Sequence, residues 1–459
     1  MFRNKIGKFW LAISVLVSTA VISTPSYALP SFARQTNKAC AACHFENFPM
    51  LTDYGRAFKA SGFTEIYTEP TRENTDSASA NMSLPLVLNA AFFGTMRYDR
   101  YSGSSTDSAG NPTYANFSDF TVPEEASLFI SGRVASYVGF HSEIGLRPSA
   151  GLAAVKLPFS FPINDSMRVL VVPFAADGHG PSYGFETLNT GASDIHLTFE
   201  NAGETAAQEY LGTGDQGATG VAAVLWDPRF YVSYTRWAPT FGPAGIGSNY
   251  APGSGVQTGK APSANYVRVV YFVPIRGWDA AIGFQDFSGS AATPFDASTG
   301  TLYDGSRVNA VMWAIDAQVQ GAIGKYPLGV YFTHGHAPPS GANVNLFNPS
   351  GGAIGIGVHA KTATTITSSF GLIPGKINIS AGVRFANNGT DSSITGVTSS
   401  DNAYTGGVVY LFSQNVKFLF EITRLQHASG GDLDGNFNNN GHLTTNVNQK
   451  MTFKLFYDL

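Results

Sequence analysis

The clearest chemistry in the sequence lies in two cysteines and a histidine near the N-terminus. Cys40 and Cys43 are the only cysteines of the chain, and His44 follows directly, which gives the pattern C-x-x-C-H. Two thiols at this spacing can bond to the two vinyl groups of one porphyrin, and the adjacent imidazole can then coordinate the iron. The pattern predicts one covalent haem c, attached through Cys40 and Cys43, with His44 as the proximal iron ligand.

Two other uses of the same residues remain open, a redox dithiol and half of a zinc site. A thioredoxin-like dithiol is typical of a βαβ context, which the sequence lacks. Zinc would require further cysteines or paired histidines nearby. The haem interpretation is therefore favoured.

A short helix is expected just after the motif. Thr52 is a suitable N-cap, Asp53 favours the first turn, and Ser61-Gly62 should end the helix after Lys59. Such a helix would help to position whatever the motif binds.

Four side chains of this helix could contact a haem. Tyr54 and Phe58 share one face and could pack on the porphyrin, while Arg56 and Lys59 could meet the haem propionates. The alternative is an amphipathic helix with ordinary surface charges.

The N-terminus has the pattern of an export signal. Basic residues precede an apolar run over 9–22, and Ser26-Tyr27-Ala28 resembles a cleavage site. We expect residues 1–28 to be a signal peptide and the mature chain to begin at Leu29, although a membrane anchor is an alternative.

Composition points to a membrane sheet. Only 13% of the residues are charged, whereas 43% are hydrophobic, and 34 Phe and 20 Tyr are present. No run after residue 28 offers the roughly 20 apolar residues that a membrane helix needs. The net charge of -4 and the absence of a basic run give no support to nucleic-acid binding.

Alternation of apolar and polar residues, broken by turns, extends to the C-terminus. Val416, Phe418, Phe420 and Ile422 share one face of a strand, and the last strand puts Met451, Phe453, Leu455, Tyr457 and Leu459 on one face. Tight turns are expected at Asp227-Pro228, Arg276-Gly277, Gly324, Pro374-Gly375 and Gln414-Asn415, and polar loops at 99–124, 238–263, 336–355 and 428–444. The candidate strands are 84–98, 125–134, 136–147, 166–175, 192–199, 218–226, 229–237, 264–274, 278–288, 305–320, 325–335, 356–371, 375–387, 402–412, 415–427 and 445–459.

These features predict an all-β fold, an up-and-down antiparallel transmembrane β-barrel of about sixteen strands over residues 80–459, surrounded by outer-membrane lipid. An even strand number places both barrel ends in the periplasm. The alternative is a soluble β-sandwich.

The predicted haem segment, residues 29–70, is too short to bury a haem alone. A barrel of this size leaves a channel, so we expect the segment to plug the lumen from the periplasmic side.

The motif region resembles a known family. The residues in question are LPSFARQT at 29–36, CAACH at 40–44, and FPMLT at 48–52 followed by Gly55, Arg56, Phe58 and Lys59. They resemble the fused outer-membrane cytochrome–porin family, whose best-known members are iron oxidases of iron-oxidising bacteria. The resemblance covers about 35 residues and does not extend to motifs in the barrel.

The resemblance implies a monohaem domain inside a barrel. Such a domain would take electrons from extracellular Fe(II) and pass them to a periplasmic cytochrome or other carrier, acting as an Fe(II):cytochrome c oxidoreductase by outer-sphere transfer. It implies further that Gly55, Arg56, Phe58 and Lys59 shape the haem pocket. A diffusion porin with a haem plug and a haem peroxidase-type enzyme remain alternatives.

The sequence does not decide which residue is the sixth iron ligand. Met50 is one candidate, and the lumen-facing positions expected for His141, His196 and His359 offer others. Two further metal sites are weaker. His334 and His336 share a strand face, and 432–436 resembles part of a calcium loop, although loop solubility explains it better.

Overall fold

The structure is a computed structural model of the whole chain. It describes residues 30–46, 48–66, 89–106, 112–146, 151–191, 206–213, 217–239, 262–292, 307–349, 355, 357–395, 398–413, 415–426 and 449–458. The predicted signal peptide, the strand at 192–199 with His196, the loop 432–436 and Leu459 lie outside these residues.

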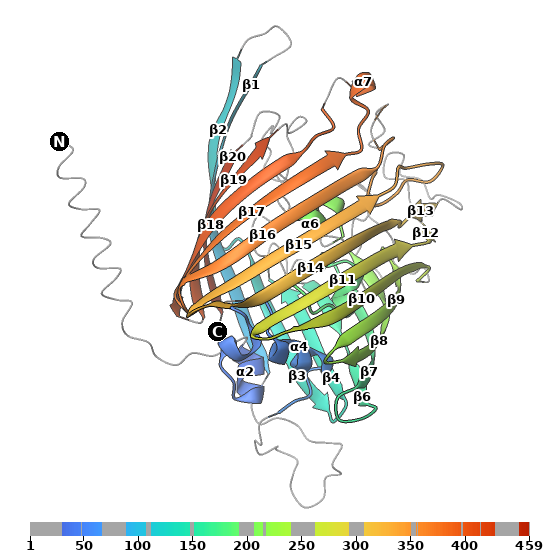
Figure 1. Cartoon of the computed structure of the whole chain (residues 1–459), viewed down its shortest axis with the longest axis vertical. Coiled ribbons are helices and arrows are strands. Elements are labelled where there is room, and N and C mark those ends of the chain that lie inside the picture. The colour runs from blue at the N-terminus through green and yellow to red at the C-terminus, as the bar shows by residue number, and fades with distance from the viewer. Residues whose placement is uncertain are drawn as a thin grey trace, which may run out of the picture.

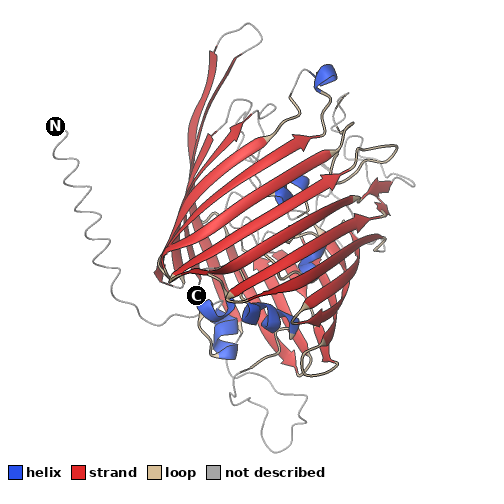
Figure 2. Cartoon of the chain, in the orientation of Figure 1, coloured by secondary structure: helices blue, strands red, loops and turns tan. Residues whose placement is uncertain are grey.

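The described chain consists mainly of strands (Figure 2). The helices are α2 (Pro30–Thr36), α3 (Cys40–Cys43), α4 (Asp53–Ala60), η1 (Pro181–Gly184), α6 (Ala207–Leu211) and α7 (Ser392–Thr395). The strands are β1 (Ala90–Thr106), β2 (Pro112–Thr121), β3 (Ala126–Ala135), β4 (Val138–Gly145), β5 (Gly151–Lys156), β6 (Phe159–Pro162), β7 (Arg168–Ala176), β8 (Ala218–Asp227), β9 (Phe230–Ala238), β10 (Ala264–Ile275), β11 (Trp278–Ser288), β12 (Ser290–Ala292), β13 (Arg307–Asn309), β14 (Met312–Ile323), β15 (Tyr326–Ala337), β16 (Lys361–Ile373), β17 (Ile377–Asn388), β18 (Asn402–Ser413), β19 (Val416–Gln426) and β20 (Gln449–Asp458). None of the helices in the described ranges is long and apolar enough to cross a membrane.

One antiparallel sheet of 18 strands closes on itself, because β20 pairs with β1 (Figure 1). Two pairs of strands are halves of single interrupted strands. β2 and β3 both pair with β1, and β5 and β6 both lie between β4 and β7. Counted in this way, the barrel has sixteen strands, as predicted.

The predicted alternation places apolar residues outside and polar residues inside. On β20, Phe453 is 48% exposed on the outer surface, whereas Lys450 and Thr452 face inward and are 3% and 0% exposed. On β19, Phe420 and Ile422 are likewise exposed. Since side chains alternate with period two, each strand contributes to both surfaces.

The strand list was wrong in two places. β5 and β6 fall in a stretch that we predicted to be a connection, because each is short and Leu157-Pro158 interrupts the pattern. Residues 99–106 and 112–121, predicted as a loop, form the β1–β2 hairpin, which extends beyond the neighbouring strands (Figure 1). Serines, threonines and glycines along this hairpin hide the alternation.

The two ends of the barrel differ. The short turns at 228–229, 276–277, 324–325 and 374–376 lie at the same end as the start of β1 and the end of β20. Helices α2 and α4 lie at this end as well (Figure 1). The longer connections are at the other end, which is the asymmetry predicted for an outer-membrane barrel.

An inward-facing ion cluster joins the first and last strands. Glu124, in the break between β2 and β3, contacts Arg97 of β1 at 3.2 Å and Lys454 of β20 at 2.8 Å. Asp99 accepts a hydrogen bond from Thr452 across the same seam. One carboxylate therefore holds three chain segments where the barrel closes.

Replacing Glu124 with Gln should destabilise the barrel by about 1–3 kcal/mol, because Arg97 and Lys454 would lose their shared anion. The temperature at which the folded band converts to the unfolded band in detergent electrophoresis measures this. Asp165→Asn, at an exposed turn position, is the control and should match the wild type. Equal conversion temperatures for Glu124→Gln and the control would show that the seam does not depend on this cluster.

Candidate functional site

The motif cysteines lie on α3, a single helical turn. Their positions, three residues apart, put both thiols on one side of that turn. Burial raises the pKa of Cys40 to about 12, with Asp458 adding to the effect, and raises the pKa of Cys43 to about 11. A reactive redox dithiol needs a lowered thiol pKa. These surroundings therefore do not fit a reactive redox dithiol.

His44 follows α3 with its ring oriented by the backbone. Its Nδ1 lies 3.3 Å from the carbonyl oxygen of Pro49. Because a carbonyl only accepts, Nδ1 carries the proton and Nε2 keeps its lone pair. Burial lowers the pKa of His44 to about 4. A neutral imidazole with one nitrogen held by a backbone carbonyl is the form in which histidine ligates a metal, so the residue fits the predicted role.

A tight loop connects His44 to α4. His44 and Leu51 form a β-bridge, and the Phe45 N–H donates to the Met50 carbonyl at 2.8 Å. The Thr52 hydroxyl donates to the Ala42 carbonyl at 2.6 Å, which ties the loop to α3. The loop therefore holds α3 and α4 side by side.

Helix α4 confirms the helix predicted from its end signals. Thr52 caps it by accepting a hydrogen bond from the Gly55 N–H at 3.1 Å. The helix ends at Ala60, and Gly62 follows with a φ of 71°, a conformation that favours glycine.

Gly55 allows α3 and α4 to touch. A Cβ at this position would lie 2.2 Å from the Cys43 carbonyl oxygen, well inside contact distance. The glycine is therefore needed for the approach of the helix to the motif. Its assignment to the haem pocket from the family resemblance is compatible with this position beside Cys43.

The other three predicted pocket residues have partners in the protein. Arg56 forms an ion pair with Asp279 of β11 at 2.7 Å and lies 4.8 Å from the ring centre of Phe272. Phe58 packs edge-on against Phe32 at 5.1 Å. Burial lowers the pKa of Lys59 to about 8, although the charge of Glu186 opposes the shift. Arg56 therefore attaches the segment to the barrel wall.

Of the candidate sixth ligands, Met50 is 2% exposed, and its sulfur accepts a hydrogen bond from Tyr331 of β15 at 3.0 Å. His141 is lumen-facing as expected, 9% exposed, and its ring stacks at 6.3 Å on Phe32 of the N-terminal segment. The expectation for His359 was wrong. It precedes β16 and lies in a connection at the far end, with its side chain 62% exposed beside Asp391.

His334 and His336 do share a face of β15, but it is the outer one, since their neighbours Thr333 and Gly335 are buried. Trp313 lies 5.6 Å from each of the two rings. Within the described ranges, no group of three or more His, Cys, Asp or Glu residues is placed to hold a metal ion.

Residues 30–66 contact inward-facing residues around much of the barrel. These contacts join Arg34 to Ala90 of β1, Phe48 to Lys417 of β19, Glu46 to Ser369 of β16, Met50 to Tyr331 of β15, Arg56 to Asp279 of β11 and Ala60 to Ser160 of β6. The segment thus spans the mouth of the barrel at the short-turn end.

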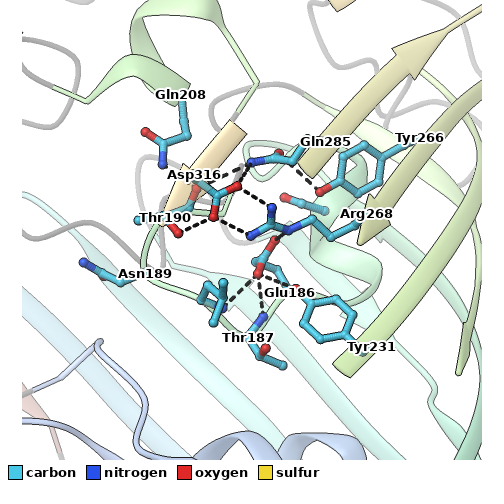
Figure 3. A network of polar contacts seen from close by, with 12 residues as sticks. Glu186, Thr187, Asn189, Thr190, Gln208, Tyr231, Tyr266, Arg268, Gln285 and Asp316 are labelled. Carbon is cyan, nitrogen blue, oxygen red and sulfur yellow. Dashed lines mark hydrogen bonds and ion pairs between the residues drawn. The ribbon is translucent and has the colours of Figure 1, made fainter. Parts of the chain in front are cut away.

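Above this segment, residues 177–191 fold into the lumen and are held by a buried charge network (Figure 3). Arg268 of β10 contacts Glu186 at 2.8 Å and also pairs with Asp316 of β14. Tyr231 donates to Glu186 at 2.7 Å, and Thr190 donates to Asp316. The charged side chains of this network are 0–1% exposed.

Other inward-facing parts of the described barrel are covered as well. Helix α6 packs on β15 and β16, and the rings of Phe287 and Phe347 are 4.9 Å apart. On β19 and β20, the inward-facing Glu421 and Lys454 are 1% and 2% exposed. Sequence reasoning missed this network. Its only signal was that the 176–191 connection broke the rhythm of short turns and long loops.

Gly55→Ala should displace α3 from α4 at a cost of about 1–3 kcal/mol, because the new methyl would meet the Cys43 carbonyl. An alanine in an ordinary helix interior would instead stabilise by about 1 kcal/mol. Covalent haem per chain, measured from the pyridine haemochrome spectrum, should fall in this variant and remain normal in the exposed control Asp53→Ala. Normal haem content in Gly55→Ala would contradict the proposed contact.

No family model matches the chain, and no curated protein matches its sequence. The fold is similar to that of OmpT of Vibrio cholerae, with 10% identity over 81% of this chain and 97% of that chain, at a TM-score of 0.42. The outer membrane channel DcaP of Acinetobacter baumannii matches with 9% identity, the same coverages and a TM-score of 0.43. OprB of Pseudomonas putida matches with 11% identity over 81% of this chain and 93% of that chain, at a TM-score of 0.47. These likenesses concern the barrel fold alone.

Proposed function

We propose that the protein is an outer-membrane electron-transfer cytochrome with one covalent haem c. One observation carries the proposal: C-x-x-C-H lies on one helical turn, its histidine is held by a backbone carbonyl, and the segment that bears it spans the barrel mouth. Cys40 and Cys43 would attach the haem, and His44 would ligate its iron. Met50 remains a candidate for the sixth ligand, to be tested spectroscopically.

Bound there, haem c would supply a one-electron couple, in which ferric iron gains one electron from a donor and returns it to an oxidised carrier. The residues of this chain would hold and orient the cofactor. The Pro49 carbonyl orients His44, Thr52 and Gly55 hold the two helices together, and Arg56 fixes the segment to Asp279. Outer-sphere transfer requires no acid–base pair at the site.

The two ends of the barrel suggest the direction of the path. Short turns are typical of the periplasmic end of such barrels, and long connections of the extracellular end. The haem segment would then face the periplasm and a soluble cytochrome or other carrier. The family resemblance favours extracellular Fe(II) as the donor, so that insoluble ferric product forms outside the cell.

A diffusion porin is the second candidate, because barrels of sixteen strands commonly enclose an aqueous channel. The described interior argues against an open channel. Arg268 of β10 and Glu421 of β19 are inward-facing polar residues on strands far apart around the barrel, and each is at most 1% exposed. A water-filled pore would leave such side chains accessible.

Electron transfer can be tested in liposomes that carry the purified protein, with ferric cytochrome c enclosed and Fe(II) added outside. We expect the enclosed cytochrome to be reduced by the wild type and by the control His334→Ala, which alters only the outer surface. His44→Ala should reduce it at least tenfold more slowly, because the iron loses its protein ligand. If haem-loaded wild type transfers no electrons from Fe(II) or other external donors, the proposal is wrong.

Conductance in planar bilayers separates the two candidates. We expect the wild type to conduct poorly. Arg268→Met should raise the conductance, because removal of one partner from a buried ion network costs about 3–5 kcal/mol and leaves Glu186 and Asp316 without a cation. Arg236→Met, at an exposed position of the adjacent strand, is the control. A wild type that conducts as well as an open porin would support the diffusion function instead.

A further inference from the structure

Lys156 is a buried lysine of the barrel wall, and none of the described carboxylates lies within ion-pair distance of it. It faces the lumen from β5 and is 5% exposed. Its ammonium donates to the Tyr183 carbonyl at 3.1 Å and lies 3.9 Å from the centre of the Tyr183 ring. Within the described part of the chain, no carboxylate pairs with it.

This arrangement is unusual, because buried charges in proteins are almost always paired with charges of opposite sign. Two inward-facing carboxylates of this region, Glu186 and Glu143, already have other partners. Glu186 receives hydrogen bonds from Arg268, from Tyr231 and from two backbone N–H groups. Glu143 lies 4.0 Å from His179.

A second lysine approaches the same place from the N-terminal segment. Lys59 precedes Ala60 on α4, and the Ala60 carbonyl accepts a hydrogen bond from Ser160 of β6 at 2.9 Å, so the end of α4 lies against the wall beside β5 and β6. Lys59 is one helical turn beyond Gly55, and the backbone of Gly55 lies against the Cys43 carbonyl. Two lysines, one from the segment and one from the barrel wall, thus lie on the side of the barrel where α4 ends, one helical turn from the contact of α4 with the cysteine motif.

The surroundings are otherwise apolar and aromatic. Phe63 lies 5.9 Å from the Lys156 ammonium, and its ring stacks on Phe32 at 5.0 Å. His141 contacts both of these rings, and its Nδ1 hydrogen-bonds to Ser131 at 2.7 Å. A ligand for this place should combine a flat apolar body with anionic groups at its edge.

We propose that Lys156 and Lys59 bind the propionate carboxylates of the haem, so that the barrel wall supplies half of the carboxylate site. The inference rests on the proposed function, since it requires the haem. It goes further because it makes the redox properties of the haem depend on a residue more than a hundred positions beyond the attachment motif. Neither Lys156 nor any other barrel residue was expected to contact the propionates.

The test uses the full-length, haem-loaded protein and the variant Lys156→Met. Loss of the cation leaves a propionate charge uncompensated, which stabilises ferric iron. We expect a lower midpoint potential, and we expect the pH range over which the potential varies to move upward, because the propionate binds its proton more readily. Lys156→Arg keeps the charge and should restore both properties.

Lys325→Met is the matched control, because Lys325 is exposed in a short turn at the same end of the barrel. Its potential and pH dependence should equal those of the wild type. If Lys156→Met binds haem but shows the wild-type potential and pH dependence, the inference is wrong while the proposed cytochrome function stands. If the wild type carries no covalent haem, the proposed function itself fails.

A folding defect is separated by a second measurement. Without haem, Lys156→Met should be at least as stable as its parent, because it replaces a buried amine with an apolar side chain of similar length. The comparison is made in the Cys40→Ala/Cys43→Ala background by the electrophoretic unfolding temperature. If Lys156→Met destabilises this haem-free protein, Lys156 has a structural role, and the propionate proposal is overturned.

Discussion

The position of the N-terminal segment in the barrel depends on one constraint: the helices of this segment are too short to be stable by themselves. Helix α2 has 7 residues and α4 has 8, whereas isolated helices shorter than about 12–15 residues are marginal in water. Each is stabilised by tertiary contact. Ala60 packs among buried apolar residues of β7, β8 and β10, and Arg56 pairs with the wall. The segment and the barrel must therefore fold as one unit.

Further parts of the chain enter the lumen behind this segment. Residues 177–191 and α6 occupy this place, and the Glu186–Arg268–Asp316 network fixes the first of them (Figure 3). A buried ion network adds little net stability compared with apolar packing, but it specifies one position for the loop.

The proposed electron-transfer role depends on how the motif segment is held. Such a site needs a cofactor that is shielded from water and held by rigid surroundings, and it needs no path for a bulky solute. The close contact between Gly55 and Cys43 and the hydrogen bond from His44 to Pro49 are features of a fixed ligand geometry. The charges around Lys59 and Lys156 would then tune the potential of the proposed haem.

Local signals in the sequence determined much of this protein. The C-x-x-C-H motif, the end signals of α4, the period-two alternation of β19 and β20 and the short turns all depend on residues near one another in the chain, and the structure confirms the helix, the strands and the turns. Only the tertiary structure decided the rest. The pairing of Arg56 with Asp279 and of Arg268 with Asp316, the burial of Lys156, the interrupted strand β5–β6 and the exposed place of His359 join residues far apart or break a local pattern. Such contacts follow from how the barrel closes around its contents, and no periodicity along the chain encodes them.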